Sequence, residues 1–227
     1  VEKIIVGLES LYDVLTSVEK IGQIVDLNME EVSAIKSDYC FTNISITTEN
    51  LRFRYPDSTD DILSDIDINI EPSEKIYLDG NNGSGKSTFI RLLSGFIQPT
   101  SGSFFINDAT YRKMDLTHYR SQISAITQGE TPFEGTIFEN ITLNNPSVSY
   151  EDVKWAIESV QLGSFIKTLP NGLETKIFPD GRQLSSSNAQ KILLARSIVS
   201  KPKILFYEDP LDKMDEDASK EIIEFIT

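Results

Sequence analysis

A glycine-rich turn between two structured runs is the feature that most constrains this chain. The turn, Gly80-Asn-Asn-Gly-Ser-Gly-Lys-Ser87, has the spacing G-x-x-x-x-G-K-[ST]. The run at 74–80 before it predicts a strand, and the run at 87–97 after it predicts a helix. Glycines at these positions let backbone N–H groups turn inward around an anion, and the helix adds its positive dipole end. The pattern predicts a strand–turn–helix unit that holds the phosphates of a nucleotide.

Composition and charge narrow the class of protein. The chain has 227 residues, 39% of them hydrophobic, which suits one large domain or a core with a subdomain. Its net charge of -14 argues against nucleic acid as a partner, because neutralising phosphates needs a basic face. The single cysteine, Cys40, forms no internal disulfide and is expected to be a buried small hydrophobe in a reducing compartment.

The first residues do not predict a signal peptide, and the sequence contains no apolar run of the roughly 20 residues that span a bilayer. It begins with Val1 rather than Met, which we interpret as a piece of a longer chain. The first segment, Val1 to about Leu27, predicts a helix with an apolar stripe. Two interpretations of the stripe stay open: it packs on its own domain, or on something outside this chain. Residues 28–39 are polar and predict a linker.

Strand-like and helix-like runs then alternate. Strands are expected within 43–55, 65–70, 102–108, 121–128 and 201–210, and helices within 150–169, 185–200 and 215–227. Such alternation predicts a mostly parallel sheet with covered faces, and the helical stretch at about 140–190 predicts a subdomain.

Two residues of the glycine-rich turn carry specific expectations. Lys86 is placed to reach the β- and γ-phosphates, and the Ser87 hydroxyl to bind Mg²⁺. A glycine-rich turn without a ligand is the bland alternative, and the flanking strand and helix disfavour it.

With its motifs in order along nearly the whole chain, the sequence resembles the nucleotide-binding domain of ATP-binding cassette (ABC) transporters of the exporter type. The motifs that carry the resemblance are "LRFRYP", "GNNGSGKST", "ITQGETPFEGTIFENI" and the segment 169–210. The resemblance implies an α/β P-loop NTPase (RecA-like) core with a mixed sheet, plus an antiparallel β subdomain and an inserted helical subdomain.

The resemblance also implies domain boundaries. Residues 1–39 would be a helix and linker from the end of a membrane domain, and 40–227 the nucleotide-binding domain. Its core would cover about 40–130 and 190–227 and its helical subdomain about 131–189, with the chain ending before the family's switch-histidine region.

The resemblance implies a site for ATP and Mg²⁺. Tyr55 would stack on adenine, and Gln128 would contact Mg²⁺ and sense the membrane domain. Glu208 would hold Mg²⁺ through water, and Asp209 would polarise the attacking water, so that Asp209, Glu208 and Gln128 are the expected catalytic residues and Ser87, Gln128 and Glu208 the expected metal residues. The expected ATP-binding residues are Tyr55, Gly80, Asn81, Asn82, Gly83, Ser84, Gly85, Lys86, Ser87, Thr88, Ser185, Ser186 and Ser187.

The resemblance implies two partners: the membrane domain of the same parent transporter and a second nucleotide-binding domain, as a homodimer or heterodimer. ATP binding would close the dimer, and ATP hydrolysis would power export across a membrane from its cytoplasmic face.

The sequence departs from the family pattern at the signature and the acidic strand. Leu184-Ser-Ser-Ser-Asn188 stands where the family has Leu-Ser-Gly-Gly-Gln, which adds side chains where glycines approach phosphate. Glu208-Asp209 stands where the family has Asp-Glu, which moves each carboxylate by about 1–1.5 Å. Since misplacement by about 1 Å can cost on the order of 100-fold in rate, we expect reduced turnover.

Two smaller departures and one partial match concern other motifs. Pro179 replaces a glutamate of the loop that contacts the membrane domain. His118 lies upstream and cannot serve as the switch histidine, and Asp215 matches the acid of the loop at the dimer interface.

An alternative function stays open: a nucleotide-gated dimerisation or regulatory cassette with little hydrolysis. A soluble phosphoryl-transfer kinase fits the downstream motifs poorly.

Overall fold

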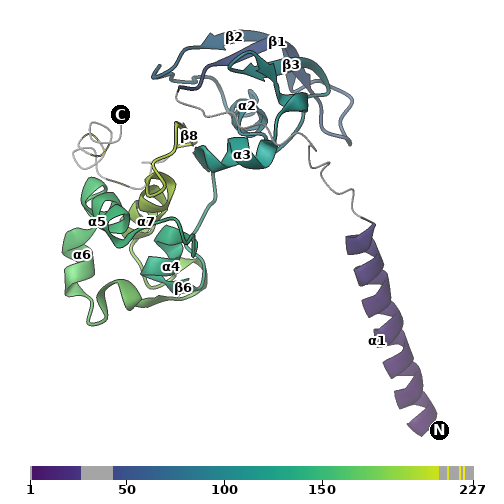
Figure 1. Ribbon diagram of the computed structural model, residues 1–227. Helices are drawn as coiled ribbons and strands as arrows, with labels where there is room; N and C mark the ends of the chain where they lie inside the picture. Colours follow the sequence, from purple (N-terminus) through teal and green to yellow (C-terminus); the bar gives the residue numbers. More distant parts are fainter. Residues whose placement is uncertain (1, 27–42, 210–213, 215–219, 221, 223–227) are drawn as a thin grey trace. The chain divides into compact units, whose positions relative to one another are not determined.

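The computed structural model describes residues 2–26, 43–209, 214, 220 and 222 (Figure 1). The chain divides into two units, Val1–Val32 and Ser33–Thr227, and each is described by itself. The expectations for the linker at 28–39, for Cys40 and for Asp215 lie outside the described residues, as does most of the expected helix at 215–227.

The first unit contains one helix, α1 (Glu2–Val25), which confirms the helix predicted there. Leu11, Leu15 and Val18 follow one another at spacings of four and three, so they share one face. All three are more than half exposed. Among the described residues, no helix is both long and apolar enough to cross a membrane.

In the second unit, four antiparallel strands form the larger sheet, in the order β2-β1-β3-β4. Their bounds are β1 (Ile46–Phe53), β2 (Leu63–Ile70), β3 (Ser101–Ile106) and β4 (Ala109–Thr110). The pairing register of β1 shifts after Thr48, and Asn50 adopts a left-handed conformation with φ 46°. Gly102 of β3 faces this irregularity, where a Cβ atom would lie 2.1 Å from the Asn50 carbonyl oxygen.

The core of this unit consists of two hydrophobic clusters. One face of the antiparallel sheet packs on the first of them. The Phe104 ring stacks on Tyr111 with centroids 4.5 Å apart. Beneath the sheet lie α2 (Lys86–Leu93) and α3 (Leu116–Ser121) (Figure 1). The 3-10 turn η1 (Tyr111–Lys113) follows β4 and precedes α3 along the chain. The buried Tyr119 hydroxyl donates to the Leu93 carbonyl at 2.8 Å, which ties α3 to α2.

A parallel pair, β5 (Ile123–Ile126) and β8 (Ile204–Tyr207), connects the two hydrophobic clusters of this unit. Ile204 and Phe206 pack against the cluster beneath the antiparallel sheet, whereas Leu205 and Tyr207 pack against the helical cluster. Since successive side chains of a strand point to opposite faces, β8 is covered on both sides, as is typical of parallel strands.

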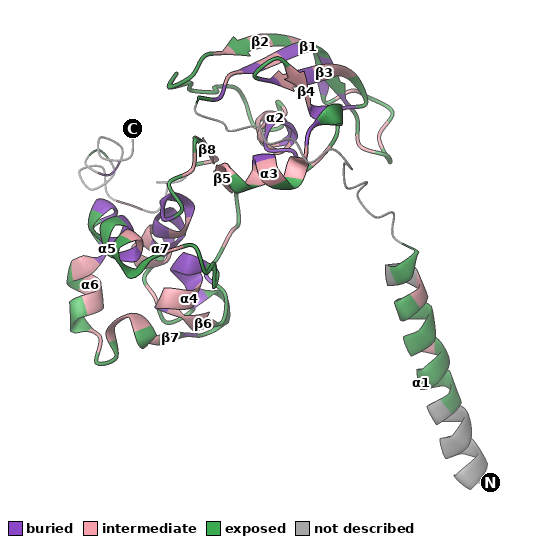
Figure 2. Ribbon diagram, in the orientation of Figure 1, coloured by how far each residue is buried: buried purple, intermediate pink, exposed green. Residues whose placement is uncertain are grey.

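The second cluster is formed mainly by helices: α4 (Ile137–Thr142), α5 (Tyr150–Ser159), α6 (Gly163–Thr168) and α7 (Ser186–Ile198). Their inward faces are buried in Figure 2. Short elements connect them: β6 (Gly135–Thr136), β7 (Lys176–Ile177), and the 3-10 turns η2 (Gly172–Glu174) and η3 (Pro179–Gly181). Capping boxes at Thr136 and Ser149 begin α4 and α5.

Several expectations about elements need correction. The single helix expected at 150–169 is two helices, because the chain turns at Gln161, which has φ 55°. The strand expected at 74–80 is wrong for this structure: no described residue pairs with it, and Tyr77 is 88% exposed. A strand needs a hydrogen-bonded neighbour, which an apolar run alone does not supply.

The mostly parallel sheet is also wrong for the described residues, since the larger sheet is antiparallel and the parallel part is the β5–β8 pair. The mixed α/β content is confirmed.

Candidate functional site

The phosphate loop, defined here as Gly80–Thr88, depends on glycine for its path. Gly83 has φ 81° and Gly85 has φ 91°, both in the left-handed region. Gly85 also lies against β2, where a Cβ atom would come within 2.9 Å of Leu63 Cδ2. The loop then turns directly into α2, whose first amide groups have no partner within the helix.

Lys86 bends back over this loop. Its Nζ donates to the carbonyl oxygens of Gly80 at 2.5 Å and of Asn81 at 3.1 Å. The Gly80 N–H donates to Asp79 Oδ1 at 2.7 Å, so the first glycine is also fixed. The ammonium thus lies beside the loop amides, and an anion bound there would replace the neutral carbonyl acceptors with a charged one.

Glu208, directly after β8, brings three distant segments together. One carboxylate oxygen, Oε1, accepts the Ser87 hydroxyl, and the other, Oε2, accepts the Gln128 backbone N–H at 3.1 Å. The Glu208 N–H donates to the Ile126 carbonyl at 2.9 Å, which extends the β5–β8 pairing by one bond. The parallel pairing therefore positions the carboxylate at the start of α2.

These oxygens suit a magnesium ion. Mg²⁺ prefers oxygen ligands and is commonly held by one or two carboxylates together with substrate phosphates. The Ser87 hydroxyl and the Glu208 carboxylate converge next to the phosphate loop and provide such ligands. Among the described residues, no group of three or more His, Cys, Asp or Glu side chains forms a separate metal site.

The neighbouring acid, Asp209, has a different environment. It is exposed and adopts a left-handed backbone with φ 46°, a conformation that Asp tolerates. Its side chain makes no hydrogen bond or ion pair with the described part of the chain. Unlike Glu208, this carboxylate has no hydrogen-bond partner among the described residues.

Tyr55, just after β1, lies beside the first turn of α2. Its ring meets Phe53 edge to face, with centroids 4.8 Å apart, and its hydroxyl lies 3.4 Å from Thr88 Oγ1. The aromatic expected to contact a base is thus near the residues expected to contact phosphate.

The three serines at the start of α7 form a separate part of the expected site, distinct from the residues around the phosphate loop. Ser185 is the N-cap, and its Oγ accepts the Asn188 N–H at 3.2 Å. The hydroxyl hydrogen of Ser185 remains able to donate. Among the residues described, no hydrogen bond joins Ser185, Ser186 or Ser187 to the phosphate loop.

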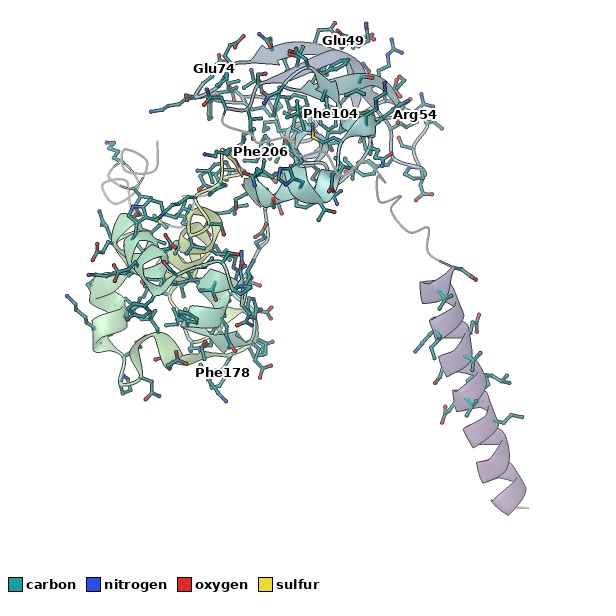
Figure 3. All side chains as sticks on the ribbon, viewed as in Figure 1. Glu49, Arg54, Glu74, Phe104, Phe178 and Phe206 are labelled. Atoms are coloured by element: carbon teal, nitrogen blue, oxygen red, sulfur yellow. The ribbon has the colours of Figure 1, made fainter. Side chains whose placement is uncertain are left out.

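Other expected residues lie at the periphery. Pro179 opens η3 and is exposed, next to Phe178, whose side chain is 61% exposed and lies on the outside of the helical part (Figure 3). His118 lies in α3, where its backbone N–H donates to the cap residue Asp115. Gln128 follows β5 with an exposed side chain, and its described contact with Glu208 is made by its backbone.

A polar pair that was not predicted from the sequence, Asn140 and Arg196, packs beside the Phe133 ring. Asn140 is fully buried, and Arg196 donates two hydrogen bonds to it. An arginine inside the apolar run "ILLARSI" was the available signal, since an apolar face seldom carries a cation without a partner.

Comparison with known proteins identifies the family that this chain matches. A model of the family described as "ABC transporter" matches residues 63–212. An ATP-dependent lipid A-core flippase of Methylobacillus flagellatus is 31% identical over 224 residues, 97% of this chain and 37% of the flippase. Multidrug resistance protein pgp-1 of Caenorhabditis elegans is 35% identical over 179 residues, 78% of this chain and 14% of that protein.

A solved structure agrees with the fold. The structure of a bacterial Atm1-family ABC exporter with ATP bound matches with a TM-score of 0.83 and 24% identity. The match covers 96% of this chain and 39% of the exporter chain. This chain therefore spans a minor part of the length of the proteins that it resembles.

Proposed function

Because the chain belongs to the ABC transporter family, as the ATP-binding domain of an exporter, we propose that it binds Mg-ATP at the phosphate loop and hydrolyses it slowly. The observation that carries this proposal is the convergence of Ser87, Gln128 and Glu208 at the start of α2. A nucleotide whose phosphates lie in the loop would reach this point with its terminal phosphate.

Each residue has a role in the proposal. The phosphate-loop amides and the Lys86 ammonium bind the phosphates, and the Tyr55 ring stacks on adenine. Ser87 and Glu208 hold Mg²⁺, with Gln128 beside them; the ion, when bound, neutralises phosphate charge. Asp209 orients the attacking water and accepts its proton, as an exposed carboxylate beside the site can do.

Slow turnover follows from the lengths of the two acids. The longer Glu208 already reaches Ser87 and the Gln128 amide, so binding is retained. The shorter Asp209 ends about 1–1.5 Å short of where a glutamate would end, and a misplacement of about 1 Å can cost on the order of 100-fold in rate. The relatives carry the names of flippases and transporters, which does not favour the alternative of a regulatory cassette without hydrolysis.

The proposal includes the arrangement of the parts. Residues 40–227 form the nucleotide-binding domain, with a RecA-like core at about 40–130 and 190–227, an antiparallel β subdomain, and a helical subdomain at about 131–189. Residues 1–39 continue from a membrane domain of the same parent transporter, on the cytoplasmic face of the membrane. A second nucleotide-binding domain, identical or different, receives Ser185, Ser186 and Ser187 against its ATP.

The Ser185 cap supports this last contact. A hydroxyl that accepts the Asn188 N–H still has its own hydrogen to donate, so Ser185 can cap α7 and donate to phosphate together. The serines at 186 and 187 add bulk at the same place, and this would weaken the closed dimer.

The decisive test is Lys86→Ala. Without the ammonium, we expect Mg-ATP affinity to fall by at least about 100-fold, measured by titration calorimetry on the 227-residue chain. Lys113→Ala, an exposed lysine at η1, is the matched control and should bind like the wild type. Unchanged affinity in Lys86→Ala would overturn the proposed binding mode.

A further inference from the structure

Arg196, in the last turn of α7, is a partly buried cation whose hydrogen-bond partners are uncharged. Its Nε donates to the Asn140 carbonyl at 2.7 Å, and its Nη2 donates to Asn140 Oδ1 at 2.8 Å. Its guanidinium carbon lies 5.3 Å from the centre of the Phe133 ring. Burial lowers the pKa of Arg196, while the charge of Glu130 acts in the opposite direction. Hydrogen bonds and the ring must offset the cost of burying this cation.

Asn140 connects Arg196 to a loop. Its Oδ1 accepts the Phe133 N–H at 2.9 Å, and its Nδ2 donates to the carbonyls of Phe133 at 2.9 Å and Thr136 at 3.0 Å. The amide thus pairs with both backbone groups of Phe133, as a neighbouring strand would. With every polar atom of the Asn140 side chain used, the backbone of Phe133 is fixed relative to α4 and α7, which pack together (Figure 1).

The fixed residue Phe133 belongs to the loop that leaves the nucleotide site. At its near end, Gln128 N–H donates to Glu208, and Glu130 Oε1 accepts the N–H and the hydroxyl of Thr127 at 2.8 and 3.0 Å. The loop is therefore held at one end by the acidic residue after β8. At its other end it is held, through Asn140, by the helix that begins at the signature serines.

We propose that Arg196 is a positioning residue that keeps the loop 128–133 in one position relative to α7. Arg196 thereby couples the position of Gln128 to that of the serines at 185–187, although no direct contact joins them in the described structure. The inference rests on the proposed ATP hydrolysis. Loss of Arg196 leaves the phosphate loop intact, so it affects turnover and not the binding of ATP.

The experiment compares Arg196→Met, Arg196→Lys and Lys191→Met in the full-length protein that contains this chain. Lys191 is the matched control: it lies in the same helix, and its Nζ makes one long contact of 3.4 Å to the Gln161 carbonyl. We expect Arg196→Met to lower kcat about tenfold with KM for ATP within about twofold. Arg196→Lys should recover part of the loss, since one ammonium can replace one of the two hydrogen bonds.

Amide hydrogen exchange separates positioning from folding. In the wild type, Mg-ATP should slow exchange in peptides covering 80–90, 127–136 and 186–198. In Arg196→Met, the slowing should persist at 80–90 and be lost at 127–136. Arg196→Lys, the milder change, provides the same measurement if Arg196→Met does not fold.

The outcomes distinguish this inference from the proposed function. Wild-type protein that neither binds nor hydrolyses ATP contradicts the proposed function. If the wild type turns over ATP and Arg196→Met matches Lys191→Met in kcat and exchange, the positioning role alone is overturned. The positioning role is overturned as well if kcat falls only in proportion to the folded fraction while ATP still protects residues 127–136.

Discussion

The phosphate loop and the acidic end of β8 lie in one candidate site, but they are built differently. The loop needs nine consecutive residues, and its conformation follows from glycines at fixed places. The acidic side needs β5 to pair with β8 so that Glu208 meets Ser87 and Gln128. The loop keeps the complete G-x-x-x-x-G-K-[ST] motif. Glu208-Asp209 stands in the reverse of the order that the resemblance implies, and Glu208 still makes its contacts.

On the proposed function, binding and turnover depend on separate parts of this chain. The amides of the loop and Lys86 would supply the donors for phosphate. Turnover would require the two acids, the loop 128–133 and the serines of α7 to be in position together.

Gly85→Ala should disrupt the phosphate loop. The new Cβ would lie 2.9 Å from Leu63 Cδ2 in a backbone with φ 91°. We expect at least about 100-fold weaker Mg-ATP binding and a loss of about 1–3 kcal/mol of folding free energy. Calorimetric titration and thermal unfolding measure the two effects.

Gly83→Ala is the control for Gly85→Ala. Its φ is 81°, but nothing lies within 4 Å of the new Cβ, so backbone strain of about 1–2 kcal/mol is the whole cost. If both variants bound Mg-ATP equally well, the close approach at Gly85 would have no importance for the site.

Exchange of the two acids after β8 should raise the rate of ATP hydrolysis. In Glu208→Asp with Asp209→Glu, the second carboxylate reaches about 1–1.5 Å further, and kcat should rise by about 10- to 100-fold. KM for ATP should change by less than about threefold, because the loop provides most of the binding. Steady-state ATPase assays on the full-length protein measure both.

Asp209→Asn is the companion to the exchange and should remove most of the remaining turnover, since an amide cannot accept the proton. A double variant no faster than wild type would show that the order of the acids does not limit hydrolysis.

Ser186→Gly with Ser187→Gly should strengthen ATP-dependent dimers by a few-fold, as judged by analytical ultracentrifugation with Mg-ATP. The same change should lower folding free energy by about 0.5–1 kcal/mol per glycine, because glycine loses more entropy in a helix. Ser186→Ala keeps the Cβ atom and should give no such gain. Stronger dimers in Ser186→Ala would assign the effect to the hydroxyl instead.

Asp152→Asn, in the first turn of α5, should have the smallest effect. Asp152 pairs with Lys201, which follows α7, and also bonds Ser149, so that its pKa falls to about 2. Because the folded pKa lies below the usual value near 3.9, the contribution to stability is full above about pH 4. It is lost as the pH falls towards 2.

The measurement for Asp152→Asn is the difference in Tm from wild type against pH. The difference should be constant from pH 7 to about 5 and vanish near pH 2, with ATP affinity unchanged at neutral pH. A difference that persisted at pH 2 would mean that the ionised carboxylate is not its source.

The helices and strands with clear periodicity were predictable from sequence, and so was the phosphate loop. Helix α7 begins after Ser185 as its serine-rich start indicated, and strands were expected in the regions where β1, β2, β3, β5 and β8 form. The break at Gln161 and the unpaired segment at 74–80 were not predictable, because each depends on neighbours that periodicity does not reveal.

The sequence by itself determined the phosphate loop, since glycine spacing, Lys86 and Ser87 are local properties of consecutive residues. Only the tertiary structure decided that Glu208 would contact Ser87, 121 residues away, and the Gln128 amide, 80 residues away. It also brought Asn140 into hydrogen-bond contact with both Phe133 and Arg196. The physical reason is that such contacts follow from strand pairing and helix packing, which no single segment contains.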